Sequence, residues 1–170
     1  MRFVHAVCLL VALLALSACS GEEVNTKART ESLPAFSIDL PEGWVTNLPE
    51  GMECTVARCL AGFAPQTQGS RSAVTVSVVP NLGKSLDEIV RESTANMAQF
   101  DAAMRLVSQS ETRVEYEGTI KGNDARLIAT IDMPKQQVGV LLLVGENDQV
   151  RKIVASIRMA NPVLNFAGAR

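Results

Sequence analysis

Apolar and polar residues alternate along several short segments of the chain. A period of two indicates a β-strand with one buried face. The strands predicted in this way lie at residues 36–40, 60–64, 73–79, 113–117, 126–133 and 137–144. The last of these segments (QVGVLLLV) is almost wholly apolar, which is typical of a central strand that is covered on both faces.

Two other segments have the spacing of an amphipathic helix. The first begins at Ser85, where Ser85 and Glu88 predict a capping box. Its apolar stripe is predicted at Leu86, Ile89, Val90, Met97, Phe100 and Met104. Packing of this stripe on a sheet is favoured over a ligand-lining surface or a partner groove. The second helix is capped by Asn147 or Asp148, and its stripe is Val150, Ile153, Val154 and Ile157.

The order of these elements predicts an α+β fold over residues 35–160. Short turns between neighbouring strands indicate antiparallel pairing, and one such turn is expected at residues 121–124, where Gly122 and Asn123 tolerate positive φ. We expect one antiparallel sheet of about five to six strands, with helices on both faces in an α/β/α sandwich. Residues 161–170 show no pattern and are expected to form a fraying tail.

An unbroken apolar run precedes the predicted domain. Residues 3–16 would span about 21 Å as a helix, which is short of the ~30 Å hydrocarbon core of a bilayer. The run follows Arg2 and ends in Leu16-Ser17-Ala18-Cys19, which resembles the processing site of bacterial lipoproteins. The alternative is an ordinary cleaved signal peptide with a chance cysteine.

The resemblance to lipoproteins implies where in the cell the chain is located. Residues 1–18 would be removed, and Cys19 would carry acyl chains that bind the lipid bilayer. Ser20 in place of an aspartate favours the periplasmic leaflet of the outer membrane. Residues 19–34 would then be the lipidated cysteine and a flexible tether, with a partner-binding arm as the alternative for this polar segment.

Charge and histidine content exclude several function classes. The net charge is −2 and no basic stripe is present, so nucleic acid is not expected as a partner. His5 is the only histidine and lies in the leader. A processed chain would therefore lack Ser-His and Cys-His pairs and the commonest metal ligand, and we expect no metal and no cofactor.

Two cysteines remain after the leader, Cys54 and Cys59. An even pair in an oxidising compartment predicts a disulfide. A metal or redox pair is the alternative, but the spacing is C-x4-C and no histidine accompanies it. Along a straight strand the two Cα atoms would lie ~17 Å apart, beyond the ~7 Å limit for a disulfide, so residues 55–58 must turn back.

The segment Phe36-Ser37-Ile38-Asp39-Leu40-Pro41-Glu42-Gly43-Trp44 resembles the start of PsbP-like domains, including the bacterial DcrB-like branch. The helix start at Ser85–Glu88, the three-strand meander and a closing helix with Ser156 follow in the order of that family. The resemblance implies a fold and a binding role, as an accessory subunit, adaptor or chaperone-like protein. The Cys54–Cys59 segment departs from the family pattern. A structural role is predicted for Trp44.

Three functions compete at this point. We expect a non-enzymatic lipoprotein that binds another envelope protein. The alternative is a carrier or sensor of a small apolar ligand, such as a lipid or glycolipid, between sheet and helix. A hydrolase is the third hypothesis, since Glu115 and Glu117 share one face of a strand about 7 Å apart. The charged outer face of an antiparallel strand explains these two carboxylates more simply, so an enzyme is not expected.

Overall fold

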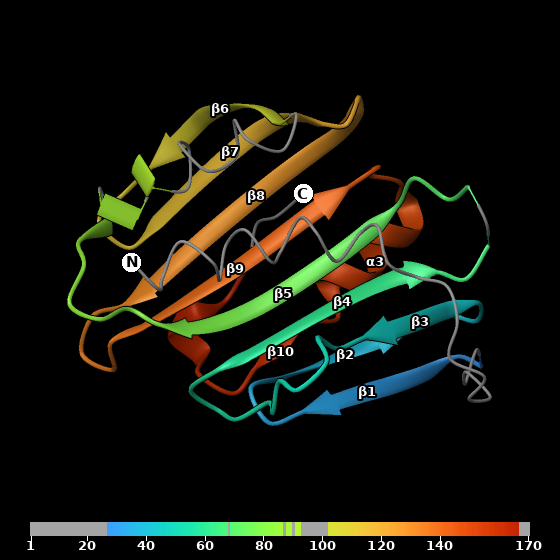
Figure 1. Ribbon diagram of the computed structural model, residues 1–170, viewed down its shortest axis with the longest axis horizontal. Coiled ribbons are helices and arrows are strands. Elements are labelled where there is room, and N and C mark those ends of the chain that lie inside the picture. Colours follow the sequence, from blue (N-terminus) through green and yellow to red (C-terminus); the bar gives the residue numbers. More distant parts are fainter. Residues whose placement is uncertain (1–26, 68, 87, 90, 93–101, 167–170) are drawn as a thin grey trace.

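A large antiparallel sheet is the main layer of the fold (Figure 1). The computed structural model of the chain describes residues 27–67, 69–86, 88, 89, 91, 92 and 102–166. Seven strands form this sheet in the order β3-β4-β5-β9-β8-β7-β6. Their bounds are β3 Trp44–Asn47, β4 Cys59–Pro65, β5 Ala73–Pro80, β6 Ala102–Gln109, β7 Arg113–Ile120, β8 Asn123–Asp132 and β9 Gln137–Val144. The apolar segment 137–144 is therefore a central strand, as its composition predicts.

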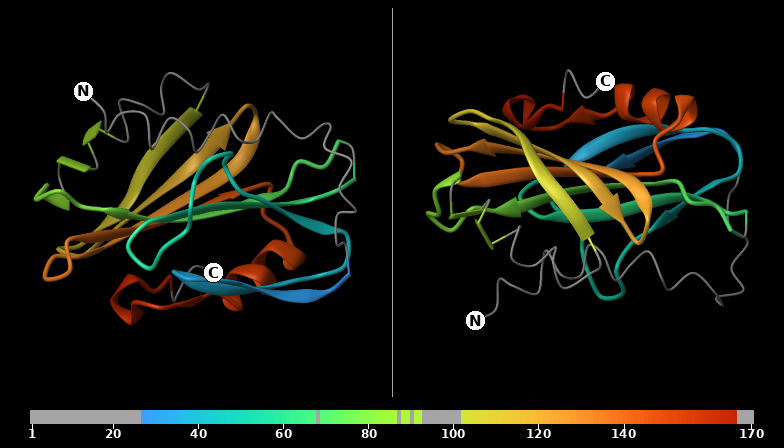
Figure 2. Two further views of the ribbon diagram at one scale, coloured as in Figure 1. Left: turned by 60° about the horizontal axis from the view of Figure 1, so that its bottom comes forward. Right: turned by 90° about the horizontal axis from the view of Figure 1, so that it is seen from above.

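A second layer covers part of one face of the large sheet (Figure 2). It contains a small antiparallel sheet of order β1-β2-β10, the helix α3 and the 3-10 turn η3. Their bounds are β1 Arg29–Leu33, β2 Phe36–Leu40, β10 Arg158–Met159, α3 Asp148–Ala155 and η3 Pro162–Leu164. The α+β class and the antiparallel pairing are confirmed. The predicted helices on both faces are not supported, because a second sheet shares the covering layer with the single helix among the described elements.

The space between the two layers is filled by the alternating side chains of both sheets. Val74, Val76 and Val78 of β5 are at most 1% exposed, while their β5 neighbours point to the opposite face. The rings of Phe36 and Phe63 meet edge to face, with centroids 6.2 Å apart. Such pairs add a small specific term to the burial of two large apolar side chains. The period of two in the sequence therefore becomes one continuous core.

The opposite face of the large sheet is also apolar. Tyr116, Leu127 and Leu142 lie on it, and Met52, Leu86 and Ile89 pack against this cluster. The predicted capping box is confirmed: the Glu88 amide donates to Ser85 Oγ over 3.3 Å, and the Ser85 amide donates to the Glu88 carboxylate over 2.8 Å. Residues 90, 93–101 of this predicted helix, including Met97 and Phe100, lie outside the described residues.

The helix α3 begins where the sequence predicts. Asn147 is its N-cap and accepts a hydrogen bond from the Val150 amide over 2.9 Å, and Val150, Ile153 and Val154 face the core. Ser156 caps the other end: its hydroxyl accepts from the Asp39 amide over 2.8 Å and so ties the end of the helix to β2.

Within the part of the chain that the structure describes, no helix is both long and apolar enough to cross a membrane.

Three sequence predictions are corrected by the fold. Residues 29–33, assigned to the flexible tether, form β1 and pair with β2. Met104, assigned to a helix stripe, lies in β6 opposite Gly118. The expected fraying tail is ordered as far as Phe166, because Leu164 and Phe166 are buried in the core. In each case contacts with residues distant in sequence determined the structure of the segment, and its local sequence did not.

The turn between β7 and β8 is tighter than predicted. Ile120 pairs with Asn123, so only Lys121 and Gly122 form the loop, with φ of 49° and 74°. Positive φ at both central positions is the type I′ arrangement that fits the twist of a hairpin. Asn123 is therefore the first residue of β8 and not part of the loop.

The Cys54–Cys59 disulfide is present, and it closes the predicted turn. The two Cα atoms are 4.3 Å apart, and the Thr55 amide donates to the Arg58 carbonyl over 2.7 Å. Because the bridge closes a six-residue loop, we expect the double variant Cys54→Ser/Cys59→Ser to lose roughly 2 kcal/mol of unfolding free energy. Urea denaturation of the oxidised chain, the chain reduced with dithiothreitol and the variant measures this. An unchanged midpoint would show that the turn forms equally well without the bridge.

Candidate functional site

The sequence-predicted site residues lie in separate parts of the chain. Cys19 is outside the described residues. Cys54 and Cys59 are joined in the disulfide and are not available as ligands or nucleophiles. Within the described ranges, no group of three or more His, Cys, Asp or Glu residues is arranged to hold a metal ion. The remaining candidate pair, Glu115 and Glu117, lies in the large sheet.

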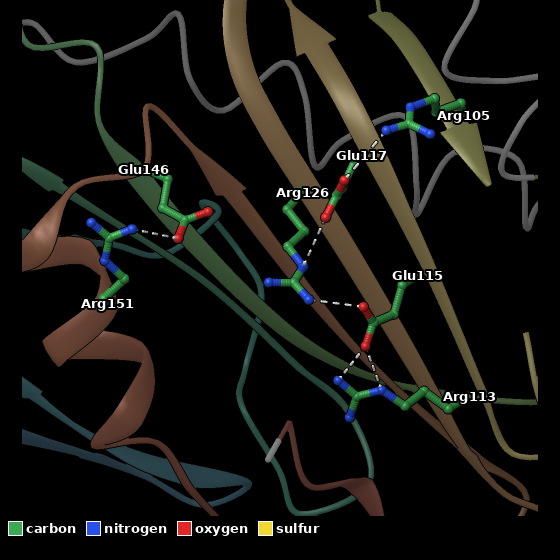
Figure 3. Close-up of polar contacts among 7 residues, drawn as sticks. All are labelled: Arg105, Arg113, Glu115, Glu117, Arg126, Glu146 and Arg151. Carbon is green, nitrogen blue, oxygen red and sulfur yellow. Dashed lines mark hydrogen bonds and ion pairs between the residues drawn. The ribbon is translucent and has the colours of Figure 1, made fainter. Parts of the chain in front are cut away.

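Glu115 and Glu117 belong to a row of charged side chains that we call the charged ladder. It lies on β6, β7 and β8, on the part of the sheet that the second layer leaves open, and consists of Arg105, Arg113, Glu115, Glu117 and Arg126 (Figure 3). Strand register places three of these side chains in one line, because Arg105 is opposite Glu117 on β6 and Arg126 is opposite Glu117 on β8. Cross-strand neighbours on one face are close enough to interact directly.

Arginines contact both carboxylates of the ladder. Glu115 accepts from Arg113 Nη2 over 2.6 Å and from Arg126 Nη2 over 2.9 Å, with one oxygen for each arginine. Glu117 is held more loosely, with 3.9 Å to Arg126 Nε and 3.7 Å to Arg105 Nη2. Arg126 therefore joins the two carboxylates, and the ladder carries three positive and two negative charges.

The ladder is graded from a covered centre to an open edge. The side chains of Glu115 and Arg126 are each 13% exposed, whereas Glu117 is 42% and Arg105 is 78% exposed. Burial by itself disfavours the charged form of Glu115, but the hydrogen bonds from Arg126 and Arg113 outweigh it. The pKa of Glu115 is consequently lowered from its ordinary value of 4.5.

This arrangement is unsuited to acid–base catalysis. A general acid must hold a proton near neutral pH, which requires a raised pKa. Glu115 instead has a lowered pKa, and both of its oxygens accept hydrogen bonds from guanidinium groups. The two glutamates share one face of β7 as predicted, but the neighbouring arginines make them part of a structural ion-pair network with an exposed rim.

The lowered pKa of Glu115 predicts a loss of stability in acid. Because the folded state favours ionised Glu115, its stabilising contribution is complete above the ordinary pKa of 4.5 and is lost as pH falls through the lower folded value. We expect Glu115→Gln to reduce the slope of unfolding free energy against pH below about pH 5, by at most ~1.4 kcal/mol per pH unit. Urea titrations at several pH values measure both slopes. Equal slopes would show that Glu115 binds protons alike in the folded and unfolded chains.

The sequence places Arg113 on the same strand face as the two glutamates, but two arginines of the ladder were not predicted beside them. Arg126 was assigned to another strand, and Arg105 to the region of a helix. The hairpin contained the signal: with a two-residue turn at Lys121–Gly122, counting back pairs Glu117 with Arg126. Arg105 had no such signal, because its strand was not predicted.

The charged pair Glu146–Arg151 lies apart from the ladder, at the start of α3 (Figure 3). Arg151 Nη1 is 3.2 Å from the Glu146 carboxylate, and Arg151 Nη2 is 2.9 Å from Asp148. Arg151 is half exposed, and exposed pairs of this kind contribute little to stability because solvent screens them. They support the first turn of the helix and add nothing to the ladder.

Comparisons with known proteins give a distant likeness in fold. No family model matches the sequence, and no curated protein matches it. Among solved structures, the chain is similar to a mutant of protein Mog1, with 10% identity, a TM-score of 0.43 and coverage of 82% of this chain and 97% of that chain. The Ran-binding protein Mog1p of Saccharomyces cerevisiae has 8% identity, with the same TM-score and coverage. A likeness of this degree carries no conclusion about function.

Proposed function

We propose that the chain is a membrane-anchored lipoprotein of the bacterial cell envelope that acts as a non-enzymatic protein-binding or accessory module. The support for the anchor is the apolar leader that ends in Leu16-Ser17-Ala18-Cys19. With Ser20 after the cysteine, the proposed site is the periplasmic leaflet of the outer membrane. The Phe36–Trp44 segment supports a PsbP-like assignment for the domain.

One observation carries the binding role. The carboxylate pair Glu115 and Glu117, which was the best catalytic candidate in the sequence, is bridged by Arg126 and flanked by two more arginines. A fixed, ion-paired sheet face with an open edge suits recognition of another surface, whereas a reaction needs a group that exchanges protons.

The anchor would keep the domain close to the bilayer. Arg29, where β1 begins, is ten positions after Cys19. An extended segment of that length reaches at most roughly 35 Å. Because β1 takes up part of the segment first assigned to the tether, the proposed connection is shorter than residues 19–34 imply.

Acylation at Cys19 is the experiment that tests the anchor. Cells expressing the full chain are labelled with a clickable palmitate analogue and then fractionated. We expect label and membrane association in the wild type, and loss of both in Cys19→Ala. Cys8→Ala is the matched control, since Cys8 lies within the leader and would be removed. Equal labelling of wild type and Cys19→Ala, or wild-type protein in the soluble fraction, would contradict the proposal.

The binding role has its own test. Chemical crosslinking in intact cells, followed by affinity purification of the acylated chain, should return a reproducible envelope partner. The alternative of a carrier for a lipid or glycolipid predicts a different result. Native mass spectrometry of the detergent-extracted chain would then show a bound small molecule in place of a protein partner.

A further inference from the structure

Large apolar side chains are exposed together at one end of the molecule, which we call the apolar tip. Four of the seven large apolar residues that are exposed among the described residues belong to it, with exposed fractions of 55% for Val56, 61% for Leu82, 44% for Met133 and 51% for Val163. They come from four different loops. Single exposed apolar residues need no explanation, but a group of them at one site indicates an interaction surface.

Hydrogen bonds between the loops bring Leu82 and Met133 to the same place. The Asn81 amide donates to the Gln136 carbonyl over 2.7 Å, and the Gly83 amide donates to Gln136 Oε1 over 2.8 Å. The Asn81 side-chain amide also lies 3.5 Å from Met133 Sδ. The turn after β5 is therefore fixed on the turn between β8 and β9.

The other two loops join the same turn. Gln137 Nε2 donates to the Val56 carbonyl over 3.4 Å, which holds the disulfide loop against the start of β9. Lys135 Nζ donates to Asn161 Oδ1 over 3.3 Å, and that oxygen also accepts from the Val163 amide over 3.3 Å. The four apolar side chains thus stand on loops that are fixed to one another.

The backbone at the tip adopts costly conformations. Leu82 has φ of 52° and Gln136 has φ of 51°, and these are two of the three non-glycine residues with positive φ among the described residues. Leucine is disfavoured both in the left-handed region and in contact with water, and asparagine or glycine would suit the position better. A residue that is unfavourable for folding on two counts points to a role outside folding.

Basic residues follow three of the four apolar tip residues closely in sequence. Each stands two positions after its apolar residue: Arg58 after Val56, Lys84 after Leu82 and Lys135 after Met133. Asp132, next to Met133, is 4% exposed and accepts a hydrogen bond from Asn161 over 2.8 Å. Lys84 pairs with Glu92, and Glu53 is the exposed acid nearest in sequence to Val56. Arg58 and Lys135, both exposed, therefore give the rim a positive character.

The tip lies at the end of the domain opposite the start of β1. Arg29 donates to the Trp44 carbonyl, and Trp44 pairs with Pro65 at one end of β4. Cys59 at the other end of β4 pairs with Val78, close to the tip. Figure 1 shows the same separation along the long strands. A chain anchored through its N-terminal segment would present the tip away from the bilayer.

We propose that the apolar tip docks a protein partner that presents an apolar recess rimmed by aspartate or glutamate side chains. This inference rests on the proposed function and names the surface that carries it. A second copy of the chain does not fit, because two tips would bring like charges together. The distance from the proposed anchor disfavours the bilayer.

Photocrosslinking in cells tests the surface and its partner. p-Benzoylphenylalanine replaces Val56 or Leu82 in the full acylated chain, and Gln149 on the exposed side of α3 is the control position. We expect one protein adduct from the tip positions and none from Gln149, with Asp or Glu in the crosslinked peptide of the partner. The adduct should fall about tenfold in Arg58→Glu/Lys135→Glu and persist in the control Lys121→Glu at the opposite end.

Leu82→Asn separates docking from folding. Because asparagine tolerates positive φ, we expect the melting temperature to rise by about 2 °C. The crosslink from position 56 should nevertheless fall about tenfold, since an apolar anchor is lost. A variant that is more stable and keeps the full crosslink would refute docking through Leu82.

The remaining outcomes distinguish this inference from the proposed function. An adduct of twice the mass of the chain would indicate a second copy, and tip-dependent binding to phosphatidylcholine–phosphatidylglycerol vesicles would indicate the bilayer. Both results would overturn the protein-partner proposal. An adduct from Gln149 alone would leave the accessory role standing and reject the tip. No adduct at any position, with Cys19 acylated, would count against the binding role itself.

Discussion

Replacing Trp44 with alanine is expected to lower the free energy of unfolding by about 3–5 kcal/mol. Trp44 is 1% exposed and lies in the core between the two sheets, at the edge of the large sheet on β3. Its removal takes away a large apolar surface and leaves a cavity that the two layers cannot close without moving. The change is measured by urea denaturation followed by circular dichroism, since the variant has no tryptophan fluorescence.

Leu48→Ala is the matched control for Trp44→Ala. Leu48 follows the same strand and is 47% exposed, so its truncation should change the unfolding free energy by no more than ~0.5 kcal/mol. A loss below about 1 kcal/mol in Trp44→Ala would show that the cavity collapses, and that Trp44 does not hold the two layers together.

Arg126→Met should have the second largest effect, a loss of about 2–3 kcal/mol. Arg126 is the one side chain that contacts both carboxylates of the ladder, and it is 13% exposed. Without it, Glu115 keeps Arg113 as a donor but loses half of its charge compensation. Burial then opposes ionisation more strongly, and we expect the pKa of Glu115 to rise.

Arg105→Met tests whether burial determines how much an arginine of the charged ladder contributes to the free energy of unfolding. Arg105 is 78% exposed and 3.7 Å from Glu117. Exposed pairs of this geometry contribute little, so a loss of at most about 0.5 kcal/mol is expected by urea denaturation. If Arg105→Met and Arg126→Met destabilise the fold equally, the difference in side-chain exposure along the ladder does not affect the contribution of its ion pairs to stability.

These expectations bear on the proposed role of the sheet face. The centre of the ladder is held by ion pairs within the domain, and only its exposed edge at Arg105 and Glu117 is open to a partner. The tip, in contrast, exposes apolar side chains whose burial would be completed only in a complex. The two surfaces therefore differ: most charges of the charged ladder are paired within the domain, whereas the side chains of the apolar tip are exposed to solvent.

Much of the fold was predictable because its signals are local. The alternation in residues 36–40, 73–79 and 137–144 matches β2, β5 and β9, and the capping residues Ser85 and Asn147 begin helical turns as expected. A capping box or a period of two depends on residues a few positions apart. The disulfide was predictable for the same reason, since its cysteines are five positions apart in the chain.

Other elements could not be predicted because their partners are distant in sequence. Residues 29–33 are polar and gave no strand pattern, yet pairing with β2 orders them as β1. Leu164 and Phe166 have no local pattern either, and they are buried because the second layer passes over them. The β6 segment combines apolar residues at helical spacing with a strand environment, and its pairing with β7 decided the outcome.

Patterns among neighbouring residues were enough to predict the strand periods, the helix starts and the disulfide turn, because each of these depends on residues a few positions apart. Long-range contacts placed a second sheet in the covering layer beside the helix. They also brought arginines from three strands into ion pairs with the carboxylates of β7, and they brought four apolar residues from separate segments to one end of the domain. These outcomes depend on strand order and register, which bring together side chains that the chain keeps far apart.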